Sequence, residues 1–197
     1  MAEDLPGSIV DQSGLQHLER VGKGTAIADE IYGLVGKSLF FAEFSHEDVA
    51  LLAGYMIVYR AQPGEIIIRE GDGGDYMLLI VEGYVDILKK GMRQDQQHMT
   101  TVTPGMTLGE MSMIDGEPRF ATCIATEPTV FAVLHRDAMA KIILDHPSLG
   151  SKILVKLVSM LSGRLRQTSA RLVNMAYWSS AEASLKPETS PKPDAPQ

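Results

Sequence analysis

The side chains that could bind a charged ligand gather between residues 105 and 122. Glu110 follows Gly109, and Arg119, introduced by Pro118, comes nine residues after Glu110. A guanidinium can pair with two phosphate oxygens in a fork geometry that lysine cannot reproduce. Glu110 would repel a phosphate if it were aimed at one, so it makes sense as an acceptor for a sugar hydroxyl. One acceptor and one cationic fork together predict a site for a ribose joined to a phosphate.

The segment Glu110–Ile114 interrupts a pattern of strands, because it is too short and too closely bounded by turns to be another strand. We predict one helical turn here. The first backbone N–H groups of such a turn lack internal partners and carry partial positive charge, which suits an anion. Gly109 lets the backbone and a ligand approach closely. From the residues alone, a salt bridge between Arg119 and Glu110 that closes one end of a barrel is the alternative interpretation.

The elements that must position these side chains are short β-branched or aliphatic runs between Tyr55 and Leu134, separated by Gly-containing and Pro-containing turns. This texture is typical of an antiparallel sandwich or barrel, and no helices alternate with the strands. Helical spacing of apolar residues precedes the strands, and Ser45 is placed to cap a helix. The predicted fold is mainly β with flanking helices: an antiparallel β-roll (jelly roll) with N-terminal helices and a long C-terminal helix.

The same patterns divide the chain into five parts. We expect a flexible lead-in, N-terminal helices, the roll, C-terminal helices and a proline-rich disordered tail, over residues 1–25, 26–54, 55–134, 135–176 and 177–197.

The predicted long helix, residues 148–175, carries a stripe of mainly apolar residues that recur alternately every four and three positions. This spacing is typical of a two-helix seam and predicts a parallel homodimer. Gly163 and Thr168 weaken a zipper, and the alternative is that the stripe packs against the chain's own β-domain. The stripe consists of Leu154, Val158, Leu161, Leu165, Thr168, Leu172 and Met175.

Composition narrows the classes of function. The formal charge of −7 argues against broad binding to nucleic acid, and charges interrupt the apolar runs before they reach the length of a membrane span. A single cysteine, Cys123, and no signal-like start predict a cytoplasmic protein. The five histidines show no metal-binding spacing within the strands, and no nucleophile elbow or phosphate loop is present. We therefore expect no catalysis and no metal or other cofactor.

In its motifs the chain resembles the cyclic nucleotide-binding domain family of catabolite activator proteins, kinase regulatory subunits and cyclic nucleotide-gated channels. The resemblance runs from about Phe40 to Leu172, with the pieces in the family's order. Residues 63–72 (PGEIIIREGD) look like the family's second and third strands with their turn, and residues 77–87 (MLLIVEGYVDI) look like its next hairpin. Residues 108–112 (LGEMS) and 118–122 (PRFAT) are similar to its phosphate-binding cassette.

The resemblance implies a cyclic nucleotide ligand, with cyclic AMP favoured and cyclic GMP or a related molecule as the other choices. By position, Glu110 would bind the ribose 2′-hydroxyl and Arg119 the cyclic phosphate. The backbone N–H groups of Gly109, Glu110 and Met111 would complete the cradle. The full set implied to bind the ligand is Gly109, Glu110, Met111, Ser112, Arg119, Phe120 and Ala121.

One position departs from the family pattern. Phe120 stands where members that bind cyclic AMP or cyclic GMP commonly carry Ser, Thr or Ala. It removes a hydroxyl and adds a ring that must find room. The alternative function is therefore a ligand-free interaction scaffold that keeps the fold, with a pocket altered by Phe120.

As a sensor, the protein would signal by rearranging its C-terminal helices toward a dimer mate or an unidentified effector protein. Tyr177 and Trp178 could fold over a bound base as an aromatic lid. Residues 176–197 are too few and too proline-rich for a helix-turn-helix domain, so we expect no direct nucleic-acid partner.

Overall fold

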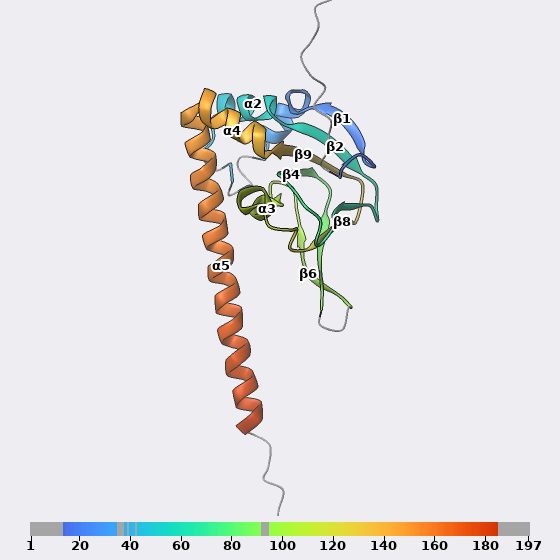
Figure 1. Ribbon diagram of the computed structural model, residues 1–197, viewed down its shortest axis with the longest axis vertical. Helices are drawn as coiled ribbons and strands as arrows, with labels where there is room; N and C mark the ends of the chain where they lie inside the picture. The colour runs from blue at the N-terminus through green and yellow to red at the C-terminus, as the bar shows by residue number, and fades with distance from the viewer. Residues whose placement is uncertain (1–13, 35–37, 39, 42, 92–94, 185–197) are drawn as a thin grey trace, which may run out of the picture. The chain divides into compact units, whose positions relative to one another are not determined.

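The structure is a computed structural model that describes residues 14–34, 38, 40–41, 43–91 and 95–184, with side chains described up to residue 174. The chain divides into two compact units, Met1–Leu157 and Val158–Gln197. The first unit holds both sheets and the shorter helices (Figure 1).

Two antiparallel sheets form the roll, as predicted. The five-stranded sheet has the order β1-β2-β9-β4-β7, and the four-stranded sheet has the order β3-β8-β5-β6. The first contains β1 (Glu19–Lys23), β2 (Ile57–Ala61), β9 (Thr129–His135), β4 (Tyr76–Glu82) and β7 (Thr107–Leu108). The second contains β3 (Ile66–Ile68), β8 (Thr122–Ala125), β5 (Val85–Lys90) and β6 (Gln96–Val102). The predicted fold class, mainly antiparallel β with flanking helices, is confirmed.

The core lies between the two sheets and is filled by alternate residues of their strands. Tyr76, Leu78 and Ile80 of β4 belong to this core, as the two-residue period of a strand requires. Tyr59 of β2 stacks on Phe131 of β9, with 6.0 Å between ring centroids. The roll is therefore a packed interior, and a polar group can enter it only with compensation from neighbours or from a ligand.

The residues before β2 are part of this interior. Leu15 and Leu18 are buried in the core, and β1 pairs with β2 from Glu19 to Lys23. This corrects the flexible lead-in predicted over residues 1–25, of which residues 1–13 lie outside the described part. The segment is glycine-rich and has no local periodicity, but its two leucines fill space that distant strands create.

Short helices follow β1, in agreement with the expected N-terminal helices. They are η1 (Gly24–Ile27), α1 (Ala28–Tyr32) and α2 (His46–Gly54). The predicted cap at Ser45 is present, because the Ser45 hydroxyl accepts from the Asp48 N–H while the Asp48 carboxylate accepts from the Ser45 N–H. Figure 1 shows α2 at one end of the sheets, together with α4 (Arg136–Asp145).

The long helix α5 (Pro147–Ser184) begins in the first unit and continues through the second. Leu149, Ile153 and Leu157 are buried in the first unit, and Lys156 binds Glu43 at 2.7 Å. The helix ends at Ser184, which corrects the predicted boundary at residue 176, and the rest of the expected tail lies outside the described residues. No helix within the described part of the chain is both long enough and apolar enough to cross a membrane.

Candidate ligand-binding site

The predicted helical turn is present as α3 (Glu110–Asp115), which directly follows β7 and lies beside β4. Gly109 caps its start with φ 78° and ψ 3°, a left-handed conformation that favours glycine. A Cβ at Gly109 would lie 2.5 Å from the Nη1 atom of Arg119. Both the turn and the close approach therefore require a glycine at this position.

Arg119 lies inside the roll, with only 3% of its surface exposed. Its Nη1 donates to the carbonyl oxygen of Gly109 at 2.8 Å, and its Cζ lies 4.1 Å from the centroid of the Tyr76 ring. The Nε and Nη2 atoms have no hydrogen-bond partner among the described residues. A buried cation with unused donors is costly, so the arrangement points to an anion that would accept from them.

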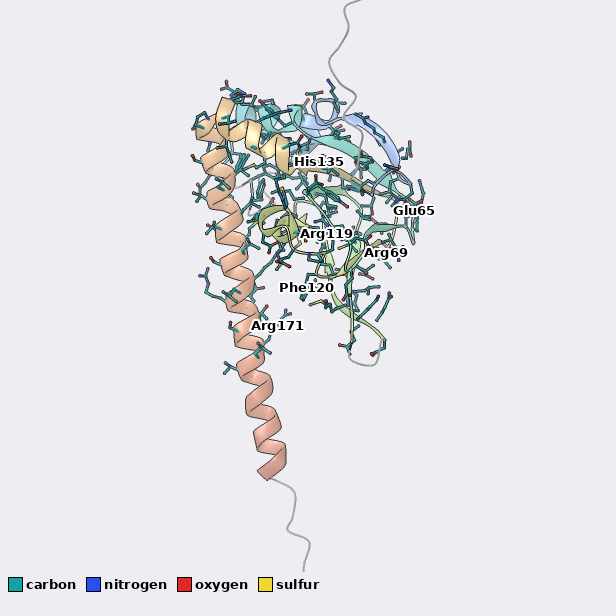
Figure 2. All side chains as sticks on the ribbon, in the orientation of Figure 1. Glu65, Arg69, Arg119, Phe120, His135 and Arg171 are labelled. Carbon is teal, nitrogen blue, oxygen red and sulfur yellow. The ribbon has the colours of Figure 1, made fainter. Side chains whose placement is uncertain are left out.

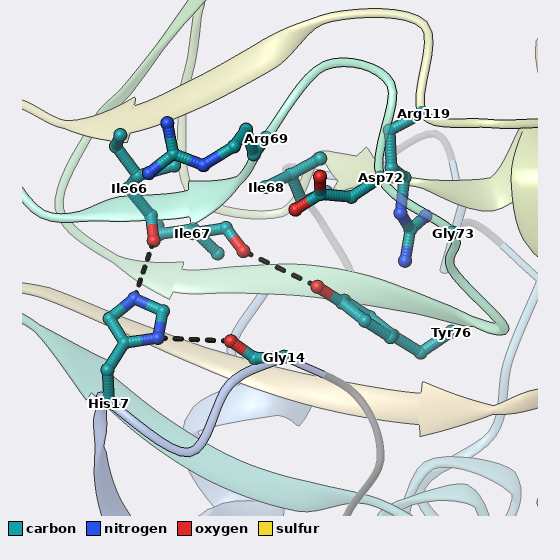
Figure 3. Close-up of a pocket in the computed structure, with 10 residues that line it drawn as sticks. All are labelled: Gly14, His17, Ile66, Ile67, Ile68, Arg69, Asp72, Gly73, Tyr76 and Arg119. Carbon is teal, nitrogen blue, oxygen red and sulfur yellow. Dashed lines mark hydrogen bonds between the residues drawn. The ribbon is translucent and has the colours of Figure 1, made fainter.

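The loop before β4 holds Arg119 in place through its backbone. The N–H of Arg119 donates to the carbonyl of Asp72 at 2.8 Å, and the N–H of Gly71 donates to the carbonyl of Arg119 at 2.9 Å. Gly74 then passes so close to the guanidinium that a Cβ there would lie 2.0 Å from Nε. The loop is therefore fitted to the arginine side chain (Figure 3).

Of the other predicted site residues, some are buried with Arg119 and some are not. Glu110 and Ser112 of α3 are buried, as is Ala121, whereas Met111 is about half exposed. The structure brings Arg119 against Gly109, whose carbonyl accepts the hydrogen bond that the guanidinium makes within the described chain. Tyr177 and Trp178 belong to α5, and their side chains lie outside the described residues.

Phe120, which follows Arg119 in the chain, is 53% exposed, whereas Arg119 is buried (both are labelled in Figure 2). Its ring lies 4.3 Å from the Nζ of Lys89, which also donates to the Phe120 carbonyl at 2.6 Å and to Glu70 at 2.8 Å. The hydrogen bond from Lys89, followed by that from the Lys90 N–H, lowers the pKa of Glu70 below its usual value. These contacts form a cluster on the rim of the roll.

A cavity of about 320 Å³ opens beside Arg119, within the size range of small-ligand pockets. The His17 ring bridges two of its walls, because its nitrogens lie 3.0 Å from the Gly14 carbonyl and 2.9 Å from the Ile66 carbonyl. Phe120 is not among the lining residues. Figure 3 shows the lining: Gly14, His17, Ile66, Ile67, Ile68, Arg69, Asp72, Gly73, Tyr76 and Arg119.

Burial at this end of the roll also governs the neighbouring thiol. Burial raises the pKa of Cys123 to about 12, while the nearby charge of Arg119 lowers it and that of Glu110 raises it further. Cys123 is a buried free thiol. The described residues contain no cluster of three or more His, Cys, Asp or Glu side chains placed to hold a metal ion.

Sequence reasoning missed three residues that shape the site. Tyr76 and Gly74 contact the guanidinium, as described above. Arg136, the first residue of α4, donates from Nε to the Met113 carbonyl at 2.6 Å and from Nη2 to the Ser112 carbonyl at 2.7 Å. These bonds satisfy the end of α3 and tie it to α4. The glycine-rich run before Tyr76 is the sequence feature that could have indicated Gly74 and Tyr76. No local sequence pattern indicates Arg136.

The family model and the solved structures that this chain matches all point to one family of domains. The family model described as "Cyclic nucleotide-binding domain" matches residues 59–146. A crystal structure of a cyclic nucleotide-binding domain from Methylobacillus flagellatus is 39% identical with a TM-score of 0.74, covering 83% of this chain and 93% of that one. The catabolite activator protein of Thermus thermophilus is 26% identical with a TM-score of 0.65, covering 71% and 64%.

Among curated proteins, a cAMP-dependent protein kinase regulatory subunit of Yarrowia lipolytica is 30% identical over 117 residues, which are 59% of this chain and 30% of that protein. The chain thus spans less than a third of the length of this relative.

Proposed function

This chain belongs to the cyclic nucleotide-binding domain family, and from that premise we propose that it is a regulatory protein whose roll binds cyclic AMP or a related cyclic nucleotide. Several similar proteins are described by cyclic AMP, among them the kinase regulatory subunit of Yarrowia lipolytica and a cAMP-activated regulator of Mycobacterium tuberculosis. A cGMP-dependent protein kinase of Eimeria tenella is also similar, so cyclic GMP is the second choice.

The observation that carries the proposal is the state of Arg119. Its guanidinium is buried, and Nε and Nη2 have no hydrogen-bond partner among the described residues. A phosphate oxygen would accept from these donors, and each charge-assisted hydrogen bond contributes about 1.5–3 kcal/mol. The remaining nitrogen, Nη1, already donates to Gly109 at the start of α3, which sets the cation beside the cassette.

The residues of α3 are proposed to complete the site. The Glu110 carboxylate accepts from the ribose 2′-hydroxyl, and the N–H groups of Gly109, Glu110 and Met111 surround the phosphate. Ser112, Phe120 and Ala121 flank these positions. The burial of Glu110 supports its role, since a buried carboxylate binds a hydroxyl donor more strongly than an exposed one does.

The test is calorimetry of cyclic AMP binding to the full chain. Arg119→Ala should weaken binding by about 100-fold or more, because it removes two charge-assisted hydrogen bonds. Lys89→Ala is the matched control, since Lys89 is a nearby cation whose contacts are with the protein itself, and its affinity should stay within about threefold of wild type. Equal affinities of wild type and Arg119→Ala would refute the assignment.

The alternative function is a ligand-free scaffold in which Phe120 alters the pocket. The outward position of Phe120 over Lys89, away from the lining of the cavity beside Arg119, favours the sensor. A thermal-shift screen with cyclic AMP, cyclic GMP and cyclic dinucleotides separates the two. A ligand at 100 times its Kd stabilises the fold by about 2.7 kcal/mol, whereas a scaffold shows no shift with any of them.

Signalling is proposed to run through the C-terminal helices to a dimer mate or an effector protein in the cytoplasm. The two hydrogen bonds from Arg136 to the end of α3 support this route, since a shift of α3 would act directly on the first residue of α4. Exposed apolar side chains of α5, such as Leu165 and Leu172, support a homodimer through residues 148–175. In analytical ultracentrifugation, the wild-type protein should sediment as a dimer and Leu165→Glu as a monomer. A wild-type protein that sediments as a monomer would contradict the proposed dimer.

A further inference from the structure

We infer that Tyr76 is a positioning residue for Arg119: its aromatic ring holds the guanidinium in place while leaving its N–H donors available to a ligand. The inference rests on the proposed function for its effect on ligand affinity. The holding itself concerns the free protein and is tested separately below.

The Tyr76 ring is a fixed support. The side chain is buried, and Tyr76 begins β4, where it pairs with His135 of β9. Its hydroxyl donates to the carbonyl of Ile67 in β3 at 3.4 Å, so the ring is held at its backbone end by one sheet and at its hydroxyl end by the other. The Cζ of Arg119 lies 4.1 Å from the ring centroid, within the range of a cation–π contact.

The loop closes on the guanidinium from another direction. A Cβ at Gly74 would lie 2.0 Å from Nε and 2.2 Å from Cζ of Arg119. Gly74 has no positive φ, so its backbone conformation does not demand a glycine. A side chain here would therefore have to displace the guanidinium of Arg119, whose atoms are the ones that it would meet. Its neighbour Gly73 also has no positive φ, and a Cβ there would meet nothing within 4 Å.

An aromatic support suits this task better than a carboxylate would. An arginine side chain has large rotational freedom, and among the described residues the Arg119 guanidinium has one hydrogen bond, from Nη1, to orient it. A carboxylate partner would orient the group but would occupy N–H donors and neutralise the charge. A ring attracts the flat face of the cation and accepts no conventional hydrogen bond, so Nε and Nη2 keep their donors for a phosphate.

The first experiment observes the free protein. In a ¹H–¹⁵N spectrum, the Nε–H of Arg119, identified by its absence in Arg119→Lys, should be displaced upfield by the ring current of Tyr76. Tyr76→Phe should keep this displacement because it keeps the ring, whereas Tyr76→Leu should remove it. An Nε–H resonance at the same position in wild type and in folded Tyr76→Leu would overturn the inference, whatever the protein binds.

The second experiment covers the case in which Tyr76→Leu does not fold. Gly74→Ala should displace the guanidinium from the ring, move the Nε–H resonance downfield and weaken cyclic AMP binding by about tenfold. Gly73→Ala, the matched control for the position of the guanidinium, should leave the Nε–H resonance of the free protein unchanged. An unchanged resonance in Gly74→Ala would overturn the inference. A wild-type protein that binds no cyclic nucleotide but shows the predicted resonances would refute the proposed function and leave the positioning role supported.

Discussion

Arg119 lies inside the roll, and Lys89 lies on its rim in contact with Phe120, the residue that follows Arg119. These two cations differ in how completely their charges are paired. Lys89 binds Glu70 at 2.8 Å and the Phe120 carbonyl at 2.6 Å, and the Phe120 ring lies over it. Arg119 is almost fully buried, yet its guanidinium makes one hydrogen bond within the described chain and lies against the Tyr76 ring. The more deeply buried charge is the less completely paired one.

This difference is the one expected between a structural cation and a cation that, under the proposed function, binds a ligand. Lys89 is paired in a salt bridge with Glu70. Because an unpaired buried charge lowers stability, a fold keeps one where function requires it. The two regions should therefore differ in the access of solvent to them, in the effect of each cation on the free energy of unfolding, and in the charge state of the neighbouring carboxylate.

The largest expected effect concerns access to the Arg119 end of the roll. Cys123 is buried there with a pKa raised to about 12, so its thiol stays neutral at pH 8. Its reaction with a disulfide reagent should be about 1,000-fold slower than that of the same chain unfolded in guanidinium chloride. Reaction at the unfolded rate would show that solvent reaches this region, and the contrast with the rim would fail.

The second prediction concerns the cost of the unpaired cation. Arg119→Met should raise the free energy of unfolding of the ligand-free protein by about 1–3 kcal/mol, because it removes a buried charge with unused donors. Lys89→Met, the control on the rim, should lower it only slightly, because the ion pair with Glu70 is partly exposed and screened by solvent. Urea denaturation measures both. Destabilisation by Arg119→Met beyond that of Lys89→Met would assign Arg119 a structural role.

A smaller effect is expected from Phe120, which belongs to the rim cluster. Phe120→Ala removes the ring over Lys89 and should lower stability by about 0.5–1 kcal/mol, the usual value of an exposed cation–π contact. Cyclic AMP affinity, measured by calorimetry, should change by less than about fivefold. A gain of more than about tenfold would mean that the ring obstructs the ligand and would place Phe120 with Arg119 instead of with Lys89.

Sequence alone predicted the fold class and the short helix of the site, for reasons that are local. Apolar runs bounded by turns gave the strands, and the turn-bounded segment after Gly109 gave α3. Leu15 and Leu18 were missed because nothing nearby in the sequence indicates the space that they fill. The end of α5 was placed too early, because prolines beyond residue 184 outweighed the helix-forming residues before them.

The state of Arg119 shows most clearly where sequence reasoning stops. Its type and its spacing from Glu110 predicted an anion site, but its support comes from Tyr76 and Gly74, which lie far from it in the sequence. Tyr76 directly precedes an apolar run and looks like any residue that begins a strand. Contacts of this kind depend on tertiary packing, and a single sequence does not record them.

The smallest expected effect is the charge state of Glu70, which tests whether the rim cluster is paired. The Lys89 ammonium and the Lys90 N–H lower the pKa of this carboxyl in the folded protein. A carboxyl whose pKa is lower in the folded than in the unfolded state contributes stability above the unfolded pKa, and this contribution is lost as the pH falls through the folded pKa. Lys89→Met should therefore raise the pKa of Glu70 toward its ordinary range, as measured by carboxyl ¹³C chemical shifts.

The stability difference between wild type and Lys89→Met should shrink as the pH falls through the folded pKa of Glu70. A Glu70 pKa that does not change in Lys89→Met would show that Lys89 is not paired in solution, and the contrast between the two cations would then depend on Arg119 alone.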